Sequence, residues 1–190
     1  MPDFEIDHKR IKHFNEPGHA HLLTFSCYQH LPLLNDDRRR DAFSRVLDRA
    51  LERHQFRLVA FVYMPEHVHL LVHPALDEYS ISRLLYAIKK PFSDYMKKVL
   101  QDSQSQHLQA LRVLERPGKC VFRYWQEGPG HDRNLLTVDK CVRAAEYLHN
   151  NPVRRGLANG PDQWRWSSWR FYYQENFADP ALPRIHGFPA

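Results

Sequence analysis

The chain has 190 residues, of which 43% are hydrophobic and 13% are aromatic. This composition supplies the hydrophobic core of one domain and excludes an intrinsically disordered chain. The formal net charge of +5 favours a polyanionic partner such as nucleic acid. The three cysteines form no Cys-x-x-Cys pair, which argues against a zinc finger or a disulfide framework and indicates a reducing compartment.

The first 18 residues are predicted to form an N-terminal arm that ends at Pro17-Gly18. The arm is polar and lacks the apolar segment of a signal peptide, and no later stretch is long and apolar enough to span a bilayer. We therefore expect a cytoplasmic protein without a membrane partner.

Strands and one helix alternate over the next part of the chain. Residues 19–28 are rich in β-forming side chains and predict a first strand. Residues 35–54 predict a helix that is capped by Asn35-Asp36-Asp37 and has apolar side chains at helical spacing. Residues 56–63 and 67–73 predict two strands, which a Pro-Glu turn joins into a hairpin.

The second half repeats the helix and strand signals. Ser80 can cap a second amphipathic helix, in which Pro91 should cause a kink or a break. Residues 119–125 predict a fourth strand. Thr137 begins a third helix, which ends at Asn151 because a residue before proline avoids the α region.

This order of elements predicts an α+β fold of the ferredoxin-like, split βαβ type. In that arrangement an antiparallel sheet carries helices on one face, leaves the other face free for a ligand, and has the first and third strands at its centre. Residues 19–158 would form this domain. Residues 159–190 would form a C-terminal extension whose many aromatic side chains must pack against the domain.

The segment His67-Val68-His69 lies inside the predicted third strand. Side chains at positions i and i+2 of a strand point to the same face, so the two imidazoles would stand side by side. Such a pair can bind a divalent metal. The alternative is a pair of histidines that make only local hydrogen bonds. Glu66 precedes them, and we expect its side chain to point away from theirs.

Tyr147 lies off the apolar stripe of the third helix. Its neighbours one turn away are Arg143 and Asn151, and Arg154 and Arg155 follow shortly. A phenol on a cationic, polar surface is a candidate nucleophile for a phosphate substrate. The alternative is an amphipathic tyrosine at the border of a helix.

Other candidates have less specific signals. Tyr86, Tyr95 and Tyr124 are competing nucleophiles. Lys89 and Lys90 could contact DNA or form the solvated side of the second helix. The basic residues that we expect to bind DNA are Lys89, Lys90, Arg143, Arg154 and Arg155.

Several segments resemble one family in the same order along the chain. Residues 64–71, MPEHVHLL, resemble the M-P-[NE]-H-V-H-L-L motif of single-tyrosine HUH transposases, in which U is a hydrophobic residue. Residues 147–157 resemble the Y-I-x-x-N-P-V-[KR]-x-G motif of the REP-associated tyrosine transposases. Residues 24–28 and 164–168 resemble their first strand and their W-x-W-S-S tail. The resemblance extends from about residue 19 to residue 173.

The resemblance implies a protein that binds a DNA hairpin and cleaves an adjacent single strand. His67 and His69 would hold Mg²⁺ or Mn²⁺, with Asn151 as a third ligand at the position where insertion-sequence relatives have glutamine. Tyr147 would attack the DNA and form a 5′-phosphotyrosine. The protein would act without a nucleotide cofactor, as a nucleoid-associated bacterial protein and as a monomer.

Two other functions are compatible with the same residues. One is a non-catalytic module that binds DNA or RNA on the open sheet, as a domesticated transposase would. The other is a phosphoesterase that uses a metal to activate water and forms no covalent intermediate.

Overall fold

The computed structural model describes residues 15–188. Most of the predicted N-terminal arm therefore lies outside the described residues. Residues 15–18 contact the region that precedes the second helix, where the backbone carbonyl of Glu16 accepts a hydrogen bond of 2.7 Å from the hydroxyl of Tyr79. No helix within the described range is long and apolar enough to cross a membrane.

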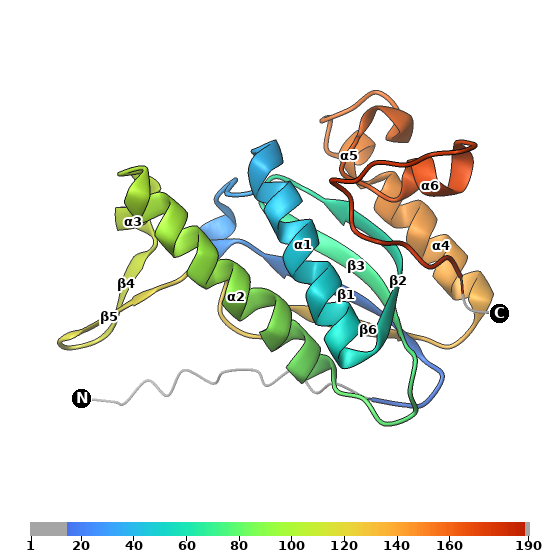
Figure 1. Cartoon of the computed structure of the whole chain (residues 1–190), viewed down its shortest axis with the longest axis horizontal. Coiled ribbons are helices and arrows are strands. Elements are labelled where there is room, and N and C mark those ends of the chain that lie inside the picture. The colour runs from blue at the N-terminus through green and yellow to red at the C-terminus, as the bar shows by residue number, and fades with distance from the viewer. Residues whose placement is uncertain (1–14, 189–190) are drawn as a thin grey trace, which may run out of the picture.

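A four-stranded antiparallel sheet forms the centre of the fold (Figure 1). Its strands are β1 (Ala20–Ser26), β2 (Phe56–Tyr63), β3 (His67–Pro74) and β6 (His131–Leu135). They lie in the order β2-β3-β1-β6, so the first and third strands occupy the centre, as predicted. The predicted α+β fold with an antiparallel sheet is confirmed.

Helices cover both faces of this sheet. Helices α1 (Asp37–His54) and α2 (Ile81–Asp102) bury their apolar stripes against one face, and α4 (Val138–His149) packs on the other (Figure 1). The expectation that one face would be free is therefore wrong in this detail. The physical reason is that α4 has its own apolar stripe, which includes Leu148 and is buried against Leu22 and Leu71 on this second face.

Helix α2 is not split at Pro91. The proline lies on the exposed side of the helix, while Ile88, three residues before it, and Phe92, directly after it, are fully buried. Proline has no N–H and leaves one helical hydrogen bond unmade at this position. The buried side chains before and after it keep the helix continuous through their packing.

The fourth strand of the sheet is not the one that the sequence predicted. Residues 119–125 contain β5 (Lys119–Phe122), which pairs only with β4 (Arg112–Arg116) in a separate two-stranded sheet. This hairpin projects from the domain together with the short helix α3 (His107–Ala110) (Figure 1). Strand β6 takes the edge position instead. Its sequence is polar because an edge strand is only partly buried, so it has no hydrophobic alternation that sequence analysis could detect.

The C-terminal extension covers the free edge of β2. It contains the short helices η2 (Pro161–Gln163) and α6 (Trp169–Tyr173), and the short helix α5 (Asn151–Arg154) precedes it. The backbone N–H of Tyr63 donates to the carbonyl of Trp166 at 2.8 Å, and the N–H of Ser168 donates to the carbonyl of Phe61 at 3.0 Å. These bonds satisfy backbone groups that an open edge would expose.

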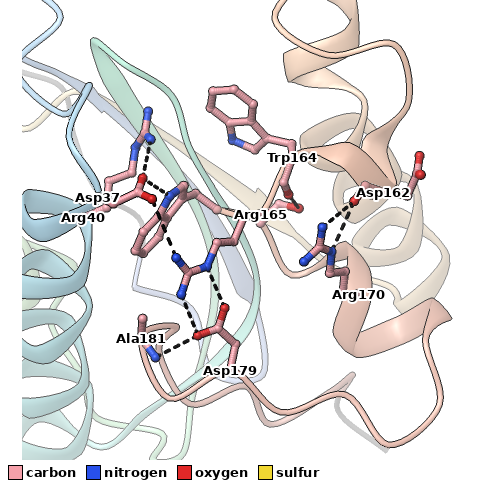
Figure 2. A network of polar contacts seen from close by, with 10 residues as sticks. Asp37, Arg40, Asp162, Trp164, Arg165, Arg170, Asp179 and Ala181 are labelled. Atoms are coloured by element: carbon pink, nitrogen blue, oxygen red, sulfur yellow. Dashed lines mark hydrogen bonds and ion pairs between the residues drawn. The ribbon is translucent and has the colours of Figure 1, made fainter.

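Arg165 and Trp166 of the extension contact Asp37 at the start of α1 (Figure 2). The guanidinium of Arg165 donates to the carboxylate of Asp179 at 2.8 Å and 3.1 Å, and it lies 3.6 Å from the carboxylate of Asp37. The indole N–H of Trp166 also donates to Asp37, at 2.6 Å. The aromatic extension therefore packs against the domain, as its composition predicted.

Candidate active site

His67 and His69 lie side by side on β3, on the sheet face that α4 covers. Their rings meet edge to face with centroids 4.7 Å apart, and their Nε2 atoms are 3.0 Å from each other. Val68 between them packs into the core on the opposite face. The alternation of the strand thus brings the two imidazoles together in the way that their spacing predicts.

The outer nitrogen of each imidazole has a polar partner. Nδ1 of His69 lies 2.7 Å from the hydroxyl of Thr24 on the neighbouring strand. Nδ1 of His67 lies 3.1 Å from the carboxylate of Glu66, which also accepts a hydrogen bond of 2.8 Å from Arg155. The expectation that Glu66 points away is wrong, because Glu66 belongs to the turn before β3 and does not follow the alternation of the strand.

Burial keeps both imidazoles neutral. Burial, with a smaller effect from a charge on His67, lowers the pKa of His69 to about 3. Burial also lowers the pKa of His67, although the carboxylate of Glu66 opposes this effect. A neutral imidazole offers the nitrogen lone pair that binds a metal.

Asn151 completes a cluster of three donor groups, which we call the donor cluster (His67, His69 and Asn151). Its side-chain amide lies 3.1 Å from Nε2 of His69, and only 9% of the residue is exposed. The chain changes direction here, because α4 ends at His149 and the short helix α5 begins at Asn151 with Pro152 in its first turn. This bend turns the amide towards the sheet.

The geometry of the donor cluster fits a divalent ion. In an octahedral shell with bonds of about 2.1 Å, neighbouring ligand atoms lie about 3.0 Å apart, which matches the separation of the two Nε2 atoms. Nδ2 is the atom of the Asn151 amide that faces His69, and rotation of the amide by about 180° brings its oxygen, the atom able to bind a metal, to the same place. No trio of His, Cys, Asp or Glu within residues 15–188 is arranged to hold a metal. The polar side chain that joins the two histidines is the amide of Asn151. Imidazole ligands favour Mn²⁺ over Mg²⁺.

Tyr147 lies next to the donor cluster. Its ring projects from α4 and meets the ring of His69 edge to face, with centroids 6.4 Å apart. The residue is 47% exposed, so a substrate can reach it. The guanidinium of Arg154 lies over the tyrosine ring, 4.9 Å from its centre. Among the candidate tyrosines, Tyr147 is therefore the one in contact with the histidines.

The competing tyrosines lie elsewhere. Tyr124 is fully buried, and its hydroxyl donates to the backbone carbonyl of Leu33 at 2.9 Å. Tyr86 and Tyr95 are exposed on α2, which packs on the opposite face of the sheet.

Two hollows flank the donor cluster, and Thr24 lines both. The first, of about 300 Å³, lies between His69 and Tyr147 and is also lined by His131, Arg133 and Arg143. His131 and Arg133 come from β6. The sequence does not identify them because the fourth strand is expected elsewhere. Their only signal is a pair of basic residue types two positions apart in a polar segment.

The second hollow lies on the side of His67. Its lining includes Ser26, His30, Glu66 and Arg155. His30 is a further residue that sequence analysis did not identify. It has a φ of +54°, which few residues other than glycine adopt, and strained backbone of this kind is concentrated at functional sites.

The predicted DNA-binding arginines all lie near the site. Arg143 lines the first hollow and has one long contact of 4.0 Å with Asp139. Arg154 packs on Tyr147, and Arg155 lines the second hollow.

The two predicted lysines lie on α2, away from the donor cluster. Lys89 is partly buried, where its ammonium donates to the carbonyls of Gly128 at 2.6 Å and Gln126 at 3.3 Å. Burial lowers the pKa of Lys89 to about 8. Lys90 is exposed and pairs with Asp94 at 2.5 Å. The structure therefore does not bring these two lysines to Tyr147.

Comparisons with known proteins place this chain in a family. The model of the family described as "Transposase IS200 like" matches residues 16–111, just over half of the chain. A Haemophilus influenzae protein assigned to the REP-associated tyrosine transposases is 23% identical over 128 residues, which are 67% of this chain and 66% of the relative. The match thus spans slightly less than two-thirds of that relative.

A solved structure has the same fold. It is a REP-associated tyrosine transposase bound to a REP hairpin, and it superimposes with a TM-score of 0.65. The match covers 93% of this chain and 92% of the other, at 14% sequence identity.

Proposed function

The chain belongs to the IS200-like transposase family, and we propose that it cleaves and rejoins single-stranded DNA beside a hairpin. The observation that carries this proposal is the contact between Tyr147 and the donor cluster within one chain. A nucleophile and a metal ion can act on the same phosphate only when they lie this close together. The relative that was solved with a REP hairpin supports a DNA hairpin as the ligand.

In this proposal Tyr147 is the nucleophile. Its phenol oxygen attacks the phosphorus, the bond from phosphorus to the 3′ oxygen breaks, and the downstream strand stays on the protein as a 5′-phosphotyrosine. The phenol proton is lost and the departing 3′ oxygen gains one. The energy of the phosphodiester is kept in the new bond, so another 3′-hydroxyl can reverse the step and join strands without ATP.

Arg154 would hold the ring of Tyr147 in place beside the donor cluster. Its guanidinium lies over the ring, 4.9 Å from the ring centre, in a cation–π contact.

The donor cluster would hold a divalent ion, Mn²⁺ or Mg²⁺. When bound there, the ion would supply positive charge to the phosphate and orient it. Thr24 and Glu66 would fix the orientation of the two imidazoles through the hydrogen bonds to their Nδ1 atoms.

The two hollows would hold the strand on either side of the cleaved bond. Arg133 and Arg143 would contact phosphates on the side of Tyr147, and Arg155 would do so on the side of His67. Because Tyr147 and the donor cluster come from the same chain, a monomer would contain a complete site.

The decisive experiment is to incubate the protein with Mn²⁺ and hairpin oligonucleotides taken from the DNA that flanks its own gene. We expect a covalent adduct on a denaturing gel, which Tyr147→Phe abolishes while hairpin binding is retained. Tyr95→Phe is the matched control, because Tyr95 is also 47% exposed but lies on α2.

Other outcomes would point to the remaining functions. An adduct that persists in Tyr147→Phe would move the nucleophile to another residue. Salt-dependent binding without cleavage would indicate a non-catalytic nucleic-acid-binding protein. Metal-dependent turnover that tolerates Tyr147→Phe would indicate a phosphoesterase.

A further inference from the structure

His30 is the last residue of the short helical turn η1 (Tyr28–His30), which lies between β1 and α1. It lines the second hollow, which has a volume of about 660 Å³. The side chain is exposed, and it forms no hydrogen bond or ion pair with the part of the chain that the structure describes. The imidazole is therefore available to a substrate that enters this hollow.

The backbone that carries His30 is fixed to the Pro65-Glu66 turn. The N–H of Leu34 donates to the first carbonyl of that turn at 2.8 Å, and the N–H of Cys27 donates to the second at 2.7 Å. Strand β3 begins directly after the turn. These hydrogen bonds therefore hold the segment with His30 in a fixed position relative to the histidine pair, as a group that acts on a substrate requires.

His30 and Tyr147 lie on opposite sides of the donor cluster. Tyr147 lines the first hollow together with His69. His30 lines the second hollow together with His67. In phosphoryl transfer the attacking and the leaving oxygen lie roughly in line, on opposite sides of the phosphorus. When Tyr147 attacks a phosphate at the donor cluster, the departing oxygen is therefore directed towards the second hollow.

The lining of the second hollow offers one suitable proton donor for this oxygen. Histidine is the side chain that can both give and take a proton near neutral pH. Arg155 does not release its proton, and Glu66 pairs with it as a carboxylate at 2.8 Å. Both ring nitrogens of His67 are already engaged, one by Glu66 and the other by His69. The hydroxyl groups of the lining are too weakly acidic, so His30 remains.

We propose that His30 is the general acid that protonates the departing 3′ oxygen during cleavage. The proposal rests on the proposed function, because it assigns one step of that reaction. As the phenol oxygen of Tyr147 bonds to phosphorus, the bond from phosphorus to the 3′ oxygen breaks, and its electron pair stays on that oxygen. The imidazolium of His30 passes a proton to the 3′ oxygen and becomes neutral, while the phenol proton passes to water.

The neutral imidazole of His30 would then serve the reverse step. When a 3′-hydroxyl attacks the phosphotyrosine, His30 accepts the hydroxyl proton, and the phenol oxygen of Tyr147 regains a proton from water. By microscopic reversibility, the acid of cleavage is the base of joining. One side chain therefore serves both halves of the reaction.

The test uses two oligonucleotides with the hairpin and cleavage site at which the wild-type protein forms its adduct. The leaving atom is the natural 3′ oxygen in one and a 3′ sulfur in the other. A thiolate departs without a proton, because a thiol is far more acidic than an alcohol. A general acid is therefore needed for the oxygen substrate and not for the sulfur substrate. The rate of adduct formation is measured in a single turnover with Mn²⁺.

The variants are His30→Ala and His30→Gln, of which the second keeps a polar side chain that cannot transfer a proton. The matched control is Gln29→Ala. Gln29 is also exposed and has a φ of +52°, so the control removes a side chain from the same kind of strained backbone, but Gln29 does not line the hollow. Circular dichroism melting checks that each variant folds, and fluorescence anisotropy without metal measures DNA binding.

We expect both His30 variants to form the adduct about 100-fold more slowly than the wild-type protein on the oxygen substrate, which is the lower end of what general acid catalysis contributes. On the sulfur substrate they should react nearly as fast as the wild-type protein. Free imidazole should restore part of the rate of His30→Ala on the oxygen substrate. Gln29→Ala should match the wild-type protein on both substrates.

Two results would overturn the role of His30 alone. One is an unchanged rate of the His30 variants on the oxygen substrate. The other is an equal loss on both substrates, which would mean that His30 only binds or positions the DNA. In both cases the wild-type adduct still forms, so the proposed function stands. If the wild-type protein forms no adduct with either substrate, the proposed function fails and the role of His30 fails with it.

Discussion

The amide of Asn151 lies 3.1 Å from Nε2 of His69, although 82 positions separate the two residues along the chain. This contact connects the end of α4 to the central strand β3. It places the helix that carries Tyr147 in a fixed position relative to the histidine pair.

Replacing Asn151 should weaken metal binding. We expect Asn151→Ala to lower the affinity for Mn²⁺ at least tenfold, because the donor cluster loses one of its three groups. Isothermal titration calorimetry measures this directly. Asn150→Ala is the control, because the amide of Asn150 donates to the carbonyl of Glu146 and not to the histidines. Equal losses in the two variants would contradict the assignment of Asn151 as a ligand.

Glu66→Gln should also weaken metal binding, although Glu66 is not a member of the donor cluster. The carboxylate orients the imidazole of His67 and makes it more basic, and loss of such a partner costs about 10- to 100-fold in affinity. Electron paramagnetic resonance of bound Mn²⁺ gives the affinity. An unchanged affinity would mean that His67 needs no orienting partner.

Ser168→Ala should destabilise the fold. The Ser168 hydroxyl is fully buried, accepts a hydrogen bond of 2.9 Å from the N–H of Phe61 and lies 2.8 Å from Nε2 of His149. The alanine leaves both groups unsatisfied, which costs about 1–3 kcal/mol in the free energy of unfolding. Urea denaturation measures the change.

Ser167→Ala serves as the control for that loss. Ser167 is equally buried, but its hydroxyl makes two longer hydrogen bonds within its own loop: it donates to the carbonyl of Trp164 at 3.2 Å and accepts from the N–H of Trp169 at 3.3 Å. We expect a smaller loss of stability, and an equal or larger one would show that the contact with His149 contributes little.

Cys27 should make stability depend on pH in the alkaline range. Burial raises the pKa of the Cys27 thiol from 9.0 to about 12, so the folded protein keeps a proton that the unfolded chain loses. This contribution is complete below pH 9 and is lost as the pH rises towards 12. At pH 10 the part of this contribution that has been lost should amount to about 1.4 kcal/mol.

Comparing the wild-type protein with Cys27→Ala between pH 8 and pH 10 tests this dependence. The variant should show a shallower decline in the free energy of unfolding. Thiol labelling offers an independent check, because Cys27 and Cys141 are buried whereas Cys120 is exposed. The native protein should label rapidly at Cys120 alone.

The sequence predicts the elements with strong periodicity and fails at those without it. The strand alternation around Val68 and the amphipathic pattern of α1 place the core and the histidine pair correctly, because burial enforces those patterns. Strand β6 has no such pattern, so His131 and Arg133 were missed. Glu66 was misjudged because a turn residue does not follow strand alternation. The distance from Tyr147 to His69 follows from the packing of α4, which local sequence does not encode.

The covered edge of β2 determines what happens when a mutation truncates the chain near its C-terminus. A frameshift or stop codon between residues 158 and 165 would leave the histidine pair and Tyr147 in the chain but would remove Trp166 and Ser168 from that edge. The exposed backbone would then pair with other chains, and the product would aggregate. Late truncations should therefore yield insoluble protein rather than a shorter enzyme with residual activity.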